Sequence, residues 1–159
     1  MMLWDEVFRE VARDYADVRA DSLLVDAAAM DLVRRPGHFD VIVASNLFGD
    51  ILSDLAAAVV GGLGMTPSGN INPERSAPSM FEPVHGSAPD IAGRGIANPV
   101  ATVLSMAMLL AHVGHGSAAE RINRAVTSVL ASEGVRTPDL GGTAGTGEMT
   151  RAIIDRLDE

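Results

Sequence analysis

The stretch from Phe39 to Leu55, FDVIVASNLFGDILSDL, constrains the fold most, because its hydrophobic pattern changes period part-way along. Residues 39–44 are nearly all apolar and rich in β-branched side chains, which predicts a strand buried on both faces of a sheet. After Ser45 and Asn46, apolar residues recur every three or four positions and predict a helix. We expect one apolar stripe of that helix to face a core; it consists of Leu47, Ile51, Leu55 and Ala58.

Two acidic residues, Asp50 and Asp54, lie one turn apart on a second stripe of the same helix. Like charges at this spacing cost an exposed helix roughly 0.2–0.5 kcal/mol. A cation between them would remove the repulsion, and Mg2+ commonly takes one or two protein carboxylates as ligands. The spacing alone leaves another interpretation open, a solvated helix face with Asp50 favoured by the helix dipole.

Composition and charge exclude several functions. The chain has 159 residues, 47% of them apolar, which suits one globular domain with its own core. Its net charge of -9 argues against non-specific binding to nucleic acid. The longest apolar helix expected, over residues 100–113, is too short to span a membrane, and the acidic amphipathic start does not resemble a signal peptide. A cytoplasmic location is the default expectation, and the absence of cysteine does not test it.

The remaining pattern predicts many helices and few strands. A short strand is expected over residues 18–24, and Thr146 is expected to cap the last helix. Helices are expected over 2–15, 25–35, 100–113 and 118–132, and after a glycine-rich turn at 141–147. The class is therefore α/β, but two or three strands are too few for a parallel sheet covered on both faces. This shortage of strands indicates part of a larger fold.

A proline-rich segment over residues 65–99 is expected to be a long ordered loop, and such loops are usually functional. Within it, Glu82 to Asp90 and the following Asn98 bring together backbone N–H groups, small residues, a histidine and an acid. Small side chains allow a nucleotide diphosphate to approach the backbone, and Asp90 could accept both ribose hydroxyls of NAD. No GxGxxG motif stands between a strand and a helix, so the site is not of the Rossmann type. A purely structural loop remains the alternative.

Three segments carry a resemblance to a known family: NLFGDILSDL, PSGNINPER and FEPVHGSAPDIAGRGIANP. They resemble the β-decarboxylating dehydrogenases, which include 3-isopropylmalate, isocitrate and tartrate/D-malate dehydrogenases. The resemblance covers nearly the whole chain, and PSGNINPER is most similar to the tartrate/D-malate branch. It implies a partial isopropylmalate-dehydrogenase-like α/β fold that lacks its N-terminal half. Residues 1–62 would end the inner, dimer-forming and metal-binding domain, and residues 63–159 would be the C-terminal part of the outer, NAD-binding domain.

The same resemblance implies the residues of a site. Asp50 and Asp54 would bind Mg2+ or Mn2+ together with the substrate, and Asp26 would complete the metal site of a partner subunit. Glu82 would lie near the nicotinamide of NAD, and the adenosine half would be held by His85, Gly86, Ser87, Ala88, Asp90 and Asn98. Family members oxidise a 2-hydroxy acid by hydride transfer and then release CO2, while the metal acts as a Lewis acid on the keto oxygen.

The catalytic lysine and tyrosine of the family have no counterpart here. All twelve basic residues are arginine, and the single tyrosine, Tyr15, does not occupy the position of the family's acid. We therefore assign no catalytic residue and expect a truncated enzyme that is inactive alone. A 3-isopropylmalate dehydrogenase fragment, a non-catalytic dimerisation partner of a full-length homologue and a split enzyme are the alternatives. Expected partners are a small 2-hydroxy acid and a second copy, a homologue or the missing half, but neither nucleic acid nor membrane.

Overall fold

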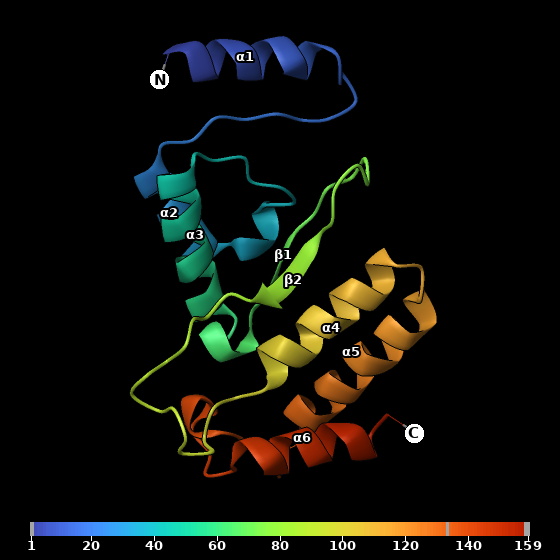
Figure 1. Ribbon diagram of the computed structural model, residues 1–159. Coiled ribbons are helices and arrows are strands. Elements are labelled where there is room, and N and C mark those ends of the chain that lie inside the picture. The colour runs from blue at the N-terminus through green and yellow to red at the C-terminus, as the bar shows by residue number, and fades with distance from the viewer. Residues whose placement is uncertain (1, 133, 158–159) are drawn as a thin grey trace. The chain divides into compact units, whose positions relative to one another are not determined.

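The computed structural model describes residues 2–132 and 134–157 (Figure 1). It has two compact units, one ending at Ile42 and one beginning at Val43. The predicted domain boundary after residue 62 concerns the longer family fold and stays a prediction. No helix of the described chain is long and apolar enough to cross a membrane. The elements are α1 (Met2–Arg13), α2 (Val25–Arg34), α3 (Asn46–Val59), β1 (Pro67–Asn70), β2 (Met80–Pro83), α4 (Val100–His112), α5 (Gly116–Ala131) and α6 (Thr146–Asp155), with short 3-10 turns at Pro36–His38, Leu63–Met65 and Pro138–Leu140.

The first unit contains α1 and α2. Helix α1 has no buried residue, and its apolar side chains Trp4 and Val7 are 46% and 49% exposed. Helix α2 buries Ala28, Asp31 and Leu32 and ends just before Pro36, since the residue preceding a proline is driven away from helical geometry. Both helices were predicted from the spacing of apolar residues, and their ends differ from the expected ones by only a residue or two.

The strand predicted over Phe39–Ala44 is not formed. Val41 and Val43 are 84% and 65% exposed, and within the described chain residues 40–44 make no backbone hydrogen bond. The short strand expected over residues 18–24 is also absent. A strand forms only where a second strand satisfies its backbone groups, and β1 and β2 are the only strands paired among the described residues. The segment has the apolar pattern of a strand, but the described residues supply no second strand to pair with it.

The second unit contains a two-stranded ribbon that packs against α4 (Figure 1). Strands β1 and β2 are antiparallel, with Pro67 opposite Pro83. At the far end of the ribbon, Arg75 donates a hydrogen bond of 2.9 Å to the carbonyl of His112 at the last turn of α4. A cation is favourable there because the helix dipole is negative at that end. The predicted loop over residues 65–99 is thus confirmed as mainly irregular with short extended pieces.

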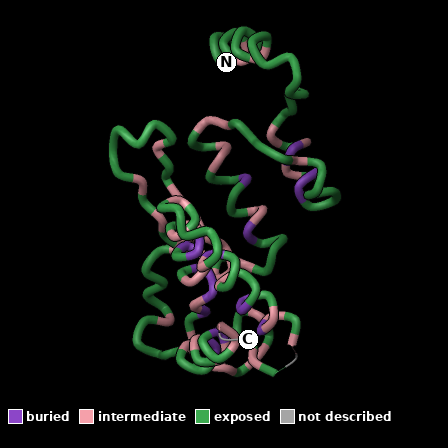
Figure 2. Tube along the Cα trace, turned by 90° about the vertical axis from the view of Figure 1, so that its right-hand side faces the viewer, coloured by how far each residue is buried: buried purple, intermediate pink, exposed green. Residues whose placement is uncertain are grey.

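The main core of this unit lies between α4, α5 and α6, where buried positions cluster near the C-terminal end of the chain (Figure 2). Val100 and Met149 are fully buried at 0% exposure. The core residues are Val100, Ala125, Val126, Val129, Met149 and Ile153. Helices α4 and α5 confirm the predicted elements, with ends that shift by one or two residues.

Helix α3 exposes the stripe that was expected to face a core. Leu47 and Ile51 are 66% and 50% exposed, whereas Leu52 and Ala57 are buried. Apolar residues lie on more than one side of this helix, so their spacing does not determine which side is covered. The prediction of the helix is confirmed, and the prediction of its buried face is wrong.

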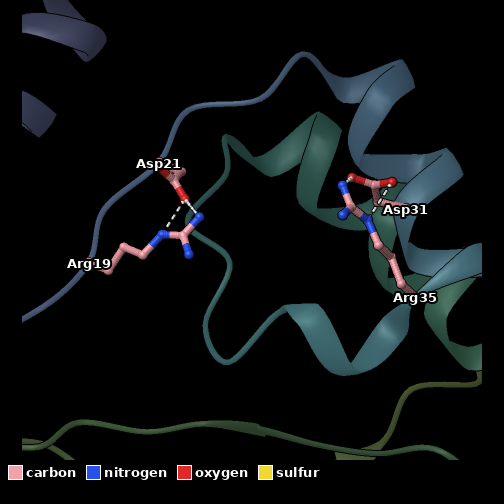
Figure 3. A network of polar contacts seen from close by, with 4 residues as sticks. All are labelled: Arg19, Asp21, Asp31 and Arg35. Carbon is pink, nitrogen blue, oxygen red and sulfur yellow. Dashed lines mark hydrogen bonds and ion pairs between the residues drawn. The ribbon is translucent and has the colours of Figure 1, made fainter.

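A bidentate ion pair stabilises the end of α2 (Figure 3). Arg35 donates from Nε and Nη2 to the two carboxylate oxygens of Asp31, at 3.0 and 2.7 Å. The Asp31 side chain is 9% exposed, whereas that of Arg35 is 60% exposed. The hydrogen bond from Arg35 lowers the pKa of Asp31, and burial opposes this effect. The pair therefore favours the ionised carboxylate in the folded chain.

This pair predicts a dependence of stability on acid. Because folding depresses the pKa of Asp31, its contribution is present above the unfolded value, about 3.8, and is lost as pH falls through the lower folded value. Urea unfolding midpoints measured downward from about pH 5 should fall more steeply for the wild type than for Asp31→Asn. Asp21→Asn is the control, because Asp21 pairs with Arg19 where both side chains are exposed. If the urea midpoints of the wild type and of Asp31→Asn fall equally steeply as the pH is lowered, the prediction is contradicted.

Candidate functional site

The exposed side of α3 presents the two predicted metal ligands. Asp50 and Asp54 are exposed, and among the described residues neither side chain has a hydrogen-bond or ion-pair partner. Their spacing of four residues places both carboxylates on one face of the helix. Free carboxylate oxygens are the donors preferred by Mg2+ and Mn2+, so this pair fits a hard divalent cation.

The third predicted ligand, Asp26, lies in the first turn of α2, within the other compact unit. It is exposed, and its Oδ1 accepts the N–H of Ala27 at 2.9 Å. Among the described residues, no three histidine, aspartate or glutamate side chains come together as a metal site. A site completed by Asp26 from a second copy of the chain therefore stays a prediction.

The predicted nucleotide loop, residues 82–98, begins at Glu82 within β2 and leaves the strand after Pro83. It continues as irregular chain that is half-buried at Val84 and His85 and exposed from Gly86 to Asp90. The half-buried His85 donates from Nδ1 to the carbonyl of Gly86 at 3.0 Å. A Cβ built on Gly86 would meet no atom within 4 Å, which leaves open space beside the backbone. This opening and the small side chains of Ser87 and Ala88 fit the close approach of a phosphate-bearing ligand.

One residue of this loop has a strained backbone. Ala88 has a φ of +44°, a left-handed conformation that costs a residue with a side chain about 1–2 kcal/mol. The turn is closed by a hydrogen bond of 3.0 Å from the N–H of Ile91 to the carbonyl of Ala88. Such strain clusters at ligand-binding sites, so the observed outlier favours a functional loop over a merely connecting one.

Asn98 differs from the other predicted nucleotide contacts because its side chain is buried. The residue is 7% exposed, and its Oδ1 accepts the N–H of Val100 at 3.0 Å at the start of α4. Its Nδ2 donates to Oδ2 of Asp139 at 2.9 Å and lies 3.6 Å from the sulfur of Met65. The side chain of Asn98 is thus fixed within the protein, whereas Asp90 remains exposed.

The glycine-rich turn before α6 supports this loop, which the sequence did not indicate. Thr146 donates from its backbone N–H to the carbonyl of Gly95 at 2.8 Å and from its hydroxyl to the carbonyl of Ala97 at 2.6 Å. The prediction that Thr146 caps α6 is therefore wrong. The helix is preceded by Gly145, whose N–H donates to the Glu148 carboxylate. The Thr146 hydroxyl does not bond within α6, because the fold brings the carbonyl of Ala97, from a distant segment, within hydrogen-bond distance.

Comparison with known proteins identifies the class to which this fold and site belong. Residues 1–153 match the family model described as isocitrate/isopropylmalate dehydrogenase. The structure superposes on isocitrate dehydrogenase from Methylococcus capsulatus with a TM-score of 0.92 and 48% identity, covering 99% of this chain and 46% of that one. The chain therefore belongs to the isocitrate/isopropylmalate dehydrogenase family, and its fold is part of the family fold.

Three curated relatives show the range of the family around this chain. Isocitrate/homoisocitrate dehydrogenase of Thermus thermophilus is 55% identical over 98% of this chain and 45% of its own length. The 3-isopropylmalate dehydrogenase of Mycolicibacterium paratuberculosis is 53% identical, over 96% of this chain and 44% of its own length. A probable tartrate dehydrogenase/decarboxylase of Agrobacterium vitis is 50% identical, over 99% and 44%. The chain thus spans less than half the length of the curated relatives it matches.

Proposed function

We propose that this chain supplies metal ligands and the adenosine half of the NAD site for the oxidative decarboxylation of a 2-hydroxy acid of the tartrate/D-malate type. The observation that carries the proposal is the pair of unpartnered carboxylates, Asp50 and Asp54, on the exposed side of α3 within the described chain. Membership of a decarboxylating dehydrogenase family supports it, because that chemistry needs a nicotinamide acceptor and is assisted by a divalent cation.

Each residue has a limited role in this proposal. Asp50 and Asp54 bind Mg2+ or Mn2+ beside the substrate, and Asp26 of a second copy completes the metal site. Asp90 accepts the ribose hydroxyls of NAD, and the open backbone at Gly86 receives its phosphates. When bound, the cation supplies Lewis-acid stabilisation of the keto oxygen as CO2 is lost. The chain binds and orients the reactants but has no assigned group for the proton transfers.

The choice of substrate rests on one segment. The relatives with isocitrate, isopropylmalate and tartrate activities in their names are 55%, 53% and 50% identical, which does not separate them. The tartrate/D-malate type is proposed from PSGNINPER, which forms β1 and the start of the following loop. Oxidation of 3-isopropylmalate is the alternative within the same reaction class.

Titration with Mn2+, followed by electron paramagnetic resonance of the free ion, tests the metal site. Replacing both carboxylates, in Asp50→Asn with Asp54→Asn, should weaken Mn2+ binding at least about tenfold, since both oxygen ligands lose their charge. Asp155→Asn on α6 is the matched control, because Asp155 is an exposed helical aspartate outside the site. Equal Mn2+ affinity in wild type and double variant would remove α3 from the metal site.

A second candidate function is association with a full-length homologue or with a separate polypeptide carrying the missing half. Exposed apolar residues favour it: Val41, Val43 and Leu47 are 84%, 65% and 66% exposed. Several large apolar side chains exposed within one short stretch of sequence are typical of a segment that other chains cover. In that case the chain lends Asp26 to the metal site of its partner without catalysing turnover itself. Co-purification with a full-length homologue would support it, and a strictly monomeric chain would exclude it.

A further inference from the structure

We propose that Asp139 is a positioning residue that holds the end of the nucleotide loop in place through the side chain of Asn98, with Thr146 as a second anchor. The inference rests on the proposed function, because it assigns this support to the adenosine half of that same NAD site. Asp139 lies on the 3-10 turn Pro138–Leu140, and Thr146 is the first residue of α6. Neither residue was predicted to belong to the site.

Three distant segments meet tightly around the Asn98 side chain. A Cβ placed on Gly64 would lie 2.9 Å from Cβ of Asn98 and 2.9 Å from Oδ2 of Asp139, closer than real Cβ contacts occur. Only glycine allows this approach. The contact between the amide and the carboxylate is therefore enclosed on the side of Gly64, while Asp139 itself is exposed to solvent on its other side.

The hydrogen-bonding chemistry determines the orientation of the amide. An ionised carboxylate only accepts hydrogen bonds, so Asp139 must face the NH2 group of Asn98. The N–H of Val100 only donates, so it must face the amide oxygen. Both partners select the same orientation, and together they tie residue 98 to the start of α4 and to Asp139.

The loop is anchored across the chain at its two ends. At the start, the N–H of Val84 donates to the carbonyl of Thr66 at 3.1 Å. At the far end, Thr146 binds the carbonyls of Gly95 and Ala97, and Asp139 binds Asn98. Between residues 85 and 94, the hydrogen bonds found in the described chain link only near neighbours in the sequence. Release of the far anchor should therefore loosen the whole exposed span and raise the ordering cost of binding a nucleotide.

Binding of AMP to the full chain, measured by calorimetry, tests this positioning role. Asp139→Leu removes the acceptor and should weaken AMP binding about fivefold, as expected for the loss of one hydrogen bond. Asp139→Asn keeps an acceptor oxygen and should stay within about twofold of wild type. Thr146→Val should weaken binding similarly, and Thr146→Ser should restore it. Thermal unfolding of each variant reports any general loss of stability.

Two results would overturn the inference. The first is an Asp139→Leu variant that binds AMP with wild-type affinity. The second is an equal loss of AMP affinity in Asp139→Leu and Asp139→Asn that parallels a fall in their melting temperatures, since this would indicate a general effect on folding. If the wild type binds no AMP, the proposed function fails, and hydrogen exchange still decides the local claim. In that case Asp139→Leu should accelerate amide exchange over residues 85–97 relative to Asp139→Asn, and unchanged exchange would refute the anchor.

Discussion

Purified alone, this chain should show no turnover with NAD, Mn2+ and D-malate, tartrate or 3-isopropylmalate, and should gain turnover when a polypeptide carrying the N-terminal half of a relative is added. The reason is that the chain contains no lysine and only one tyrosine, Tyr15. Proton transfer by a positioned side chain contributes about 10^2- to 10^4-fold to rate. The rate of NADH formation in the mixture should therefore exceed any rate measured with the chain alone by at least about hundredfold.

The N-terminal half of the Thermus thermophilus relative suits this experiment, because the matched part of that enzyme is 55% identical to this chain. Mixing it with the Asp50→Asn, Asp54→Asn double variant is the control. Association should occur but turnover should stay low, since the exposed apolar residues remain and the metal ligands are gone. Turnover by the isolated chain would refute the proposed division of roles, in which the groups for proton transfer are absent from this chain.

The second large effect is expected in the core, where Met149→Ala should lower the free energy of unfolding by about 2–5 kcal/mol. Met149 is 0% exposed and belongs to the cluster that joins α4, α5 and α6. The truncation removes buried apolar atoms and leaves a cavity that closely packed neighbours cannot fully close. Total stabilities of single domains are about 5–15 kcal/mol, so the loss is a large fraction of the whole.

Urea unfolding of the second unit measures this effect, with Ile154→Ala as the control on the same helix. Ile154 is 48% exposed, so its truncation should cost less than that of Met149. Similar losses for the two variants would mean that the burial pattern of α6 does not determine stability in this part of the chain.

Helices and the acidic pair were predictable because their determinants are local. Apolar spacing located α1, α2, α4 and α5, and the spacing of Asp50 and Asp54 placed both on one helix face. The residues alone left the metal and nucleotide roles open beside a structural interpretation, and the family resemblance favoured them; family membership is now shown by the match over residues 1–153. The individual ligand assignments remain predictions, which the Mn2+ and AMP titrations address.

By itself, the sequence determined where the helices lie, to within a residue or two at their ends, and which side chains share a helix face, because these follow from dihedral preferences and residue spacing within a few positions. Only the tertiary structure decided which apolar segments are covered. Residues 39–44 have the composition of a strand, yet Val41 is 84% exposed because a strand needs a partner from elsewhere in a fold. The bond between Asn98 and Asp139 spans 41 positions, so it depends on the packing of distant segments and has no local signal.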